Sequence, residues 1–125
     1  MEFTVETEER LTVVDVTERV AAALPTDATG ACTVFVPHTT AGVCLQEAEP
    51  RLLGDLERFL SEAVADDGWA HDDLDGNADA HLRATLIGSD VTIPVEDGSL
   101  SLGMWGRVLF VECDGPRTRR IRIIV

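Results

Sequence analysis

One long amphipathic helix is the pattern that most restricts what this chain can fold into. It is expected from about Pro50 to Ala65, where six large apolar side chains recur at close to 3.6 residues and so share one helix face. They are Leu52, Leu53, Leu56, Phe59, Leu60 and Val64. Proline suits the first turn because the amide hydrogen that it lacks would have no partner there. The fold must therefore include a helix with a single apolar face.

Short strand-like segments lie on both sides of this helix. Two strands are expected within residues 1–15, and single strands at 31–36, 42–47, 91–95, 107–113 and 119–125. The run at 31–36 is apolar except for Thr33, which predicts a strand covered on both faces, and 42–47 is its expected partner. The first and last segments alternate apolar with polar residues, as strands with one buried face do.

Two further helices complete the expected fold. A short helix is predicted at 18–24, and a second main helix at 78–87, where Asn77 is a suitable cap and Gly88 a suitable end. Six or more short strands with two main helices predict an α+β fold with a mostly antiparallel, sandwich-like sheet. The length of 125 residues predicts a single domain over residues 1–125.

The chain is strongly acidic and contains no lysine. It has 23 acidic residues against 10 basic ones, and its formal net charge is −13. Such a surface repels polyanions, so neither nucleic acids nor anionic membranes are expected partners. No apolar run approaches the ~20 residues of a membrane helix and no signal-peptide pattern is present, which predicts a soluble cytoplasmic protein. Many Asp and Glu residues without Lys also indicate a halophilic protein that works in concentrated salt.

Three cysteines, Cys32, Cys44 and Cys113, lie in apolar, strand-like segments. Their odd number and the absence of a CxxC pair argue against a disulfide framework and against a thiolate metal site. Buried free thiols are therefore expected.

The chain has three histidines, each in a loop or near the end of an element. His38 follows a predicted strand, His71 lies in a predicted loop at 65–76, and His81 lies about one turn into the second main helix. Taken singly, such histidines most often form hydrogen bonds at the surface. As a set, three imidazoles with an open fourth position are a common catalytic zinc arrangement. Only the fold can bring them together, because no two of them are four residues apart.

Three carboxylates are distinguished by their setting. Glu47 ends a predicted strand, Glu112 lies inside one, and Asp114 lies in the turn that follows it. A charge within an apolar strand needs a partner, a metal or a shifted pKa. The alternative is that Glu112 faces water or pairs with an arginine. In a chain without lysine, a ligand's phosphate must be met by arginine, histidine, a metal or backbone amides, and Arg117 beside a rigid proline is one candidate.

Two other features suit a small ligand. The start of the helix at Asn77 is a possible anion site, because its first amides have no partner. Trp69 and Trp105 can stack on a flat ring, although packing in a core or interface is the commoner role of tryptophan. The sequence has no phosphate-binding loop with lysine, no GxSxG and no HExxH, so the chemistries that these motifs carry lack their signatures.

Five spaced motifs occur in order along the chain. They are PHTTAG at 37–42, Glu47, GNADAHL at 76–82, LGMW at 102–105 and ECDGPR at 112–117. Together they resemble the YjbQ family, small proteins also called secondary thiamine-phosphate synthases. The resemblance covers nearly the whole chain and implies an α+β antiparallel sandwich that assembles as a homotrimer. It also implies a site built from the histidines around a divalent metal ion, zinc or magnesium.

The resemblance further implies a metal-dependent enzyme that acts on phosphorylated small molecules. Its reaction would join a pyrimidine diphosphate to a thiazole phosphate and release diphosphate. The implied metal ligands are His38, His71 and His81, the implied catalytic carboxylates are Glu47, Glu112 and Asp114, and the implied substrate-binding residues are Thr39, Thr40, Asn77, Trp105 and Arg117. The metal and an arginine would neutralise the departing diphosphate, and the tryptophan would lie against a ring.

Two other functions fit the same residues. One is a metal-dependent hydrolase of phosphate esters, and the other is a non-catalytic module that binds a phosphorylated metabolite. The chain also departs from the family pattern at two places. Gln46 replaces the usual asparagine before the glutamate, and Met104 and Gly106 replace the threonine and glutamine that flank the tryptophan. The second change removes polar groups that could bond a ligand beside Trp105.

Overall fold

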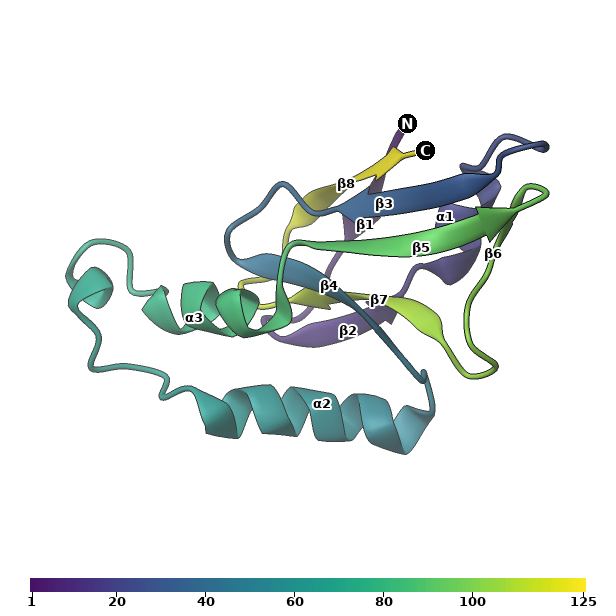
Figure 1. The fold of residues 1–125 in the computed structure, drawn as a ribbon. Coiled ribbons are helices and arrows are strands. Elements are labelled where there is room, and N and C mark those ends of the chain that lie inside the picture. The colour runs from purple at the N-terminus through teal and green to yellow at the C-terminus, as the bar shows by residue number, and fades with distance from the viewer.

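The computed structural model describes residues 1–125 and contains two antiparallel sheets, three α-helices and one short 3-10 helix (Figure 1). The strands are β1 (Glu2–Glu6), β2 (Thr12–Asp15), β3 (Gly30–Phe35), β4 (Ala41–Gln46), β5 (Asp90–Glu96), β6 (Ser99–Leu100), β7 (Arg107–Glu112) and β8 (Thr118–Ile124). The helices are α1 (Thr17–Ala22), α2 (Pro50–Ala63), α3 (Ala78–Ile87) and the 3-10 helix η1 (Ala70–Asp73). The α+β, mostly antiparallel fold is confirmed, and each predicted strand and helix is present.

The larger sheet has the strand order β1-β8-β3-β5-β6, and the smaller one has the order β2-β7-β4. Figure 1 shows the smaller sheet beneath the larger one, with α2 below it and α3 beside β4. Every pair of neighbouring strands is antiparallel. Helices α2 and α3 therefore cover the side of the smaller sheet that faces away from the larger sheet.

Two expectations for the strand at 31–36 were wrong. Its partners are β5 and β8, whereas the segment at 42–47 forms β4 in the other sheet and pairs with β7. The strand is also covered on one face only, because Ala31, Thr33 and Phe35 point to the outer face of the larger sheet and are exposed or half-buried. Two of these three outward residues are apolar, so the sequence shows a nearly continuous apolar run in place of an alternation.

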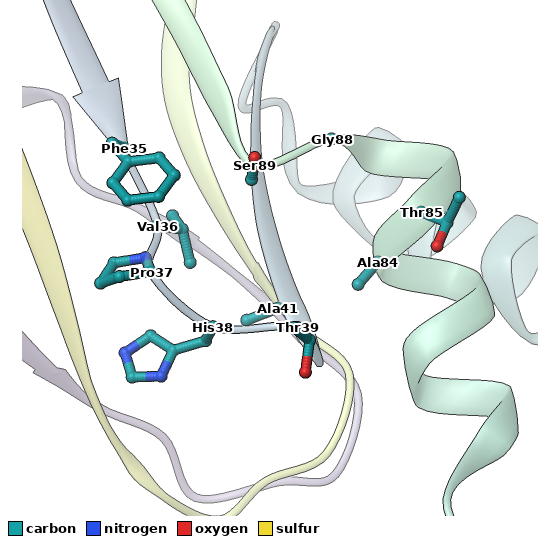
Figure 2. Close-up of a pocket in the computed structure, with 10 residues that line it drawn as sticks. All are labelled: Phe35, Val36, Pro37, His38, Thr39, Ala41, Ala84, Thr85, Gly88 and Ser89. Carbon is teal, nitrogen blue, oxygen red and sulfur yellow. The ribbon is translucent and has the colours of Figure 1, made fainter. Parts of the chain in front are cut away.

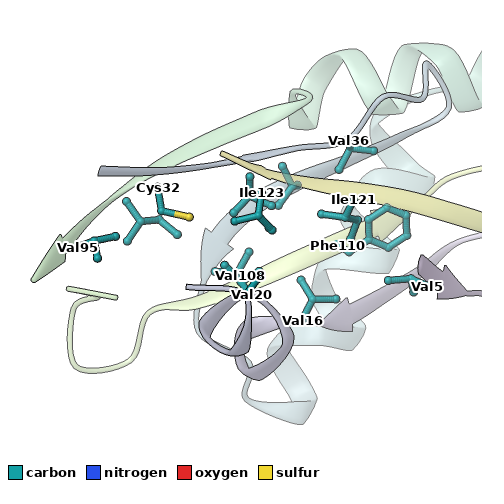
Figure 3. Close-up of a cluster of buried hydrophobic side chains, with 14 of the residues drawn as sticks. Val5, Val16, Val20, Cys32, Val36, Val95, Val108, Phe110, Ile121 and Ile123 are labelled. Carbon is teal, nitrogen blue, oxygen red and sulfur yellow. The ribbon is translucent and has the colours of Figure 1, made fainter. Parts of the chain in front are cut away.

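The main core lies between the two sheets and is closed at one end by α1. Sixteen buried residues form it. Figure 3 shows Val108 and Phe110 of β7 near Ile121 and Ile123 of β8, together with Val20 of α1. Burying one such side chain stabilises a fold by about 1.5–3 kcal/mol. The two sheets are therefore held together mainly by aliphatic contacts.

Helix α2 covers the smaller sheet only in part. Leu60 is buried beside Val111 of β7 and Ala80 of α3, whereas Phe59 is 61% exposed. The other leucines on the predicted apolar face are half-buried. No helix of the structure is both long enough and apolar enough to cross a membrane.

Arg83 of α3 ties the two main helices together. Its guanidinium donates hydrogen bonds to the carbonyl oxygens of Leu60 and Val64 at the end of α2, each at 2.8 Å. It also bonds the carboxylates of Asp79, at 2.5 Å, and Asp66, at 2.8 Å. The last carbonyls of a helix have no partner within the helix. A buried arginine therefore takes the place of a conventional cap on α2.

The pairing of β4 with β7 decides which loops meet. Ala41 lies opposite Glu112 at one end of this pair, and Gln46 lies opposite Arg107 at the other. The two ends are about 17 Å apart, because a strand rises roughly 3.4 Å per residue. The β3–β4 loop therefore meets the β7–β8 turn, whereas the β4–α2 and β6–β7 connections meet at the opposite end.

Candidate functional site

The largest cavity lies between the β3–β4 loop and the second half of α3 (Figure 2). Its volume is about 620 Å³, which is within the range of small-molecule sites. One wall is the segment 35–39, and the other includes Thr85 of α3 and Ser89 just beyond it. None of its ten lining residues is acidic, although the chain has 23 acidic residues. The cavity is therefore an uncharged site on an anionic protein.

A close backbone approach fixes the distance between β4 and the end of α3. The backbone N–H of Val43 donates to the carbonyl oxygen of Gly88 at 3.0 Å. A methyl group at Gly42 would lie 2.5 Å from that oxygen and 2.8 Å from Cγ2 of Ile87. Only glycine permits this approach. The wall that α3 contributes to the cavity is therefore attached directly to the smaller sheet.

His38 lines the cavity, but its ring points away from α3 (Figure 2). Its Nε2 accepts a hydrogen bond of 2.9 Å from the backbone N–H of Arg120. Burial, together with the charges of Arg119 and Arg120, holds the pKa of His38 below its usual value. The ring is therefore neutral at pH 7 and carries its hydrogen on Nδ1. In this arrangement His38 has an N–H to donate and no free lone pair for a metal.

The other two histidines lie together. The rings of His71 and His81 meet edge to face, with their centroids 4.9 Å apart. Nε2 of His71 is buried and has no hydrogen-bond partner, and Oδ2 of Asp75 lies 3.7 Å from it. A buried, unpartnered imidazole nitrogen is unusual, and it suits a metal ligand. However, one chain contains no group of three or more His, Cys, Asp or Glu side chains that could hold a metal.

The two threonines of the PHTTAG motif have different environments. The Thr39 side chain lines the cavity on the side of the loop that faces α3, and its hydroxyl has no partner within the chain. Thr40 is buried, and its hydroxyl accepts a hydrogen bond of 2.8 Å from Arg119. Thr39 is therefore free to bind a ligand, whereas Thr40 is part of a buried network.

Glu112 belongs to the same network and is completely buried. It accepts hydrogen bonds from Arg119 (2.5 and 2.8 Å), from the Thr7 hydroxyl (2.8 Å) and from the Asp114 backbone N–H (3.0 Å). Burial alone would raise the pKa of Glu112, but the bonds from Arg119, Asp114 and Thr7 together lower it. Of the two alternatives that the sequence left for Glu112, pairing with an arginine is therefore confirmed. With both oxygens occupied, this carboxylate supports the turn after β7.

Asp114 connects that turn to the start of α3. One of its carboxylate oxygens accepts hydrogen bonds from the Asn77 side chain and from Arg117, both at 3.0 Å. Asn77 therefore does not cap its own helix, and the carboxylate of Asp72 accepts from the Ala78 N–H instead. Oδ1 of Asn77 is buried without a partner. Three predicted site residues thus form one contact group at the helix N-terminus.

Glu47 and Trp105 lie at the opposite end of β4 and β7. Both residues line two surface cavities of about 370 and 460 Å³. The Trp105 side chain is 67% exposed and the neighbouring Met104 is 88% exposed. One chain therefore does not bring these two residues to the histidines, the threonines or Arg117.

The sequence interpretation missed several lining residues. Thr85 lies four residues after His81 and so shares its helix face, a spacing that could have indicated it. Ser89 and Phe35 gave no such signal, because their position depends on the strand pairing. Arg119 was also missed, although it occupies an inward position in the alternating strand β8.

The chain matches the family model described as UPF0047 protein YjbQ-like over residues 1–125. It belongs to this family. It is 46% identical to a UPF0047 protein of Archaeoglobus fulgidus over 97% of this chain and 96% of that protein. It is 36% identical to the UPF0047 protein YugU of Bacillus subtilis over 92% of this chain and 89% of that protein.

Solved structures of the family have the same fold. A hypothetical protein from Aeropyrum pernix K1 matches with a TM-score of 0.95 and 49% identity, over 99% of this chain and 95% of that one. An uncharacterized protein of the yjbq/upf0047 family from Clostridium acetobutylicum matches with a TM-score of 0.91 and 34% identity, over 99% of this chain and 98% of that one. These matches confirm the family and its fold, and none of these relatives is named for an activity.

Proposed function

We propose that this YjbQ-family protein is an enzyme that acts on a phosphorylated small molecule in the cavity beside α3. The main support is the absence of acidic side chains from the largest cavity of a chain with a net charge of −13. His38 lines the cavity and keeps an N–H on Nδ1 without a partner in the chain, although its ring points away from α3. The hydroxyls of Thr39 and Ser89 also line it and have no partner in the chain. Phosphate oxygens accept hydrogen bonds from such groups.

The reaction that we propose is the one implied by the resemblance to secondary thiamine-phosphate synthases. The lone pair of the thiazole ring nitrogen forms a bond to the carbon that carries the diphosphate. The carbon–oxygen bond breaks, the diphosphate leaves with that electron pair, and the ring nitrogen becomes positively charged. Donors that hold the leaving oxygens would lower the barrier, since charge develops there. Arg117, which is 51% exposed, and Asn77 contact Asp114 at the start of α3, outside the cavity lining, and would take part where the substrate extends from the cavity toward that end of the helix.

We further propose that His71 and His81 hold a divalent metal ion. The unpartnered Nε2 of His71 beside the His81 ring supports this assignment. Imidazole ligands suit zinc better than magnesium. When bound, the ion would supply positive charge that neutralises a phosphate leaving group. His38 would join as a third ligand only after releasing the hydrogen bond that it accepts from Arg120.

A homotrimer is the proposed assembly. Large apolar side chains are exposed at both ends of the molecule, among them Met104 and Trp105 at one end and Leu74 and Leu86 near α3. Only a second copy would bring Glu47 and Trp105 to a site that contains the histidines. Light scattering coupled to gel filtration should give three times the mass of 13.5 kDa. The Trp105→Ala variant should reduce the trimer fraction if this residue lies in the interface.

A cytoplasmic location is proposed on the state of the cysteines. All three are free, and Cys32 and Cys113 are buried while Cys44 is half-buried. Free thiols are kept in reducing compartments.

The function is tested with protein purified without an affinity tag. Incubation with a pyrimidine diphosphate and a thiazole phosphate should release diphosphate only when both are present. Ser89→Ala should lower kcat/KM about tenfold, the effect of one bond to a charged group. The matched change Ser99→Ala, on the exposed strand β6, should have no effect.

Each other outcome selects a different function. Phosphate release from a simple ester without a second substrate would identify a hydrolase. Saturable binding of a phosphorylated ligand without any turnover would identify a binding module. If neither binding nor turnover is detected with any phosphorylated compound, the proposed use of the cavity is wrong.

A further inference from the structure

Arg122 differs from every other arginine of the chain. Eight arginines have a carboxylate oxygen within 4.0 Å of their guanidinium. Arg19 instead lies over the Phe3 ring, 4.4 Å from its centroid. Arg122 has neither kind of partner. In a chain whose acidic residues outnumber its basic ones by 23 to 10, an unpaired guanidinium is unexpected.

The strand register places Arg122 beside the cavity. Arg122 of β8 lies directly opposite Phe35 of β3, and Phe35 lines the cavity. Residues directly opposite in an antiparallel pair share a face, with Cβ atoms about 5 Å apart. Arg120 lies two residues earlier on the same face, and its backbone N–H bonds His38. Two guanidinium groups are therefore attached to the strand that borders the cavity wall.

Two carboxylates face the same region. Glu2 of β1 lies opposite Arg122 in the register, but its carboxylate approaches Arg120, at 3.8 Å. Asp90 of β5 lies opposite Phe35 on the other side. Two strand spacings separate Asp90 from Arg122, about 10 Å, which is too far for an ion pair. Phe35 thus has a free cation on one side and a carboxylate on the other.

We propose that Phe35 and Arg122 form a subsite for a flat ring that carries an anionic group. The ring would lie on Phe35, and Arg122 would bind the anion with its planar fork of donors. The expected ligand class is an aryl or heteroaryl phosphate, with an aryl carboxylate as the weaker alternative. This inference rests on the proposed function, because it assumes that the cavity is the substrate site.

The test uses phenyl phosphate, inorganic phosphate and benzoate as probes, with binding followed by NMR titration at constant ionic strength. Wild-type protein should bind phenyl phosphate more tightly than either other probe. Arg122→Gln should weaken the binding of phenyl phosphate about tenfold. Arg58→Gln on α2, which changes the net charge equally, should leave binding unchanged. Asp90→Asn should strengthen it severalfold, because a repelling charge is removed.

The ring contact has its own variant. Phe35→Leu should reduce the preference for phenyl phosphate over inorganic phosphate and leave inorganic phosphate binding unchanged. Both side chains are at least partly exposed, so unchanged melting temperatures would show that the variants fold.

The outcomes separate this inference from the proposed function. Equal binding by wild type and Arg122→Gln, with weaker binding by Ser89→Ala, would overturn the subsite and leave the proposed function standing. Binding of benzoate as tight as phenyl phosphate would overturn the phosphate preference. No binding of any probe by the wild type would overturn both.

Discussion

Replacing Arg83 with methionine should destabilise the protein by separating its two main helices. Arg83 is 2% exposed, and its guanidinium bonds the end of α2 as well as the carboxylates of Asp79 and Asp66. Methionine keeps the apolar stem and removes all of these bonds. The change therefore probes the hydrogen bonds and charge of Arg83 and disturbs packing little.

The expected loss is about 3 kcal/mol of unfolding free energy. Removing one partner of a buried ion pair costs roughly 3–5 kcal/mol. Asp79 keeps two hydrogen bonds to Arg10, at 2.8 and 2.9 Å, so the lower end of that range applies. At about 4 °C per kcal/mol for a chain of this size, the melting temperature should fall by about 12 °C.

Urea unfolding followed by circular dichroism measures this change. The matched control is Arg58→Met, which removes an exposed pair with Glu62 at 2.9 Å and should cost less than about 0.5 kcal/mol. The double variant Arg83→Met with Asp79→Leu should be no more stable than Arg83→Met alone, because it also removes the pair that Asp79 keeps with Arg10. A loss below 1 kcal/mol for Arg83→Met would refute the view that this arginine joins the helices.

Three further predictions concern pH, metal and salt. The pKa of Glu112 lies below its ordinary 4.5, so the stabilisation that it gives is present above pH 4.5 and is lost as the pH falls through the folded-state pKa. The Glu112→Gln variant should therefore have a lower free energy of unfolding than the wild type at pH 7. In urea titrations, it should also lose less of this free energy than the wild type between pH 5 and 2. Elemental analysis should find a divalent metal in protein purified without a tag. The variant His71→Asn should lose this metal, and the control Thr33→Val should keep it. Wild-type protein without metal would contradict the assignment. The melting temperature should rise between dilute buffer and about 1 M KCl, where the Debye length is about 3 Å, because a net charge of −13 repels itself. An unchanged value would contradict adaptation to salt.

The fold was predictable wherever one side-chain pattern decides one element. Asn77 and Gly88 marked the ends of α3, and alternation marked β8. Strand pairing was not predictable in this way, because partners are set by contacts far apart in the sequence. The half-buried, outward-facing Phe35 made β3 look buried on both faces.

The candidate site was predictable only as a set of residues. The structure brings Asp114, Asn77 and Arg117 into contact and places His71 against His81. The remaining predicted residues are divided by the β4–β7 register, which no short motif encodes. The sequence also showed that Glu112 needed a partner, but the identity of that partner depended on which residues of β8 face inward.

The contact between Gly42 and Gly88 determines how the cavity can select its ligands. At Gly42 the backbone of β4 directly contacts the Gly88 carbonyl oxygen and the Ile87 side chain, so no side chain at position 42 can change rotamer to widen the gap. Arg83 holds the same helix from its other side. A cavity with both walls fixed in this way would discriminate by size, and bulkier analogues of a true substrate should be excluded outright instead of being bound more weakly.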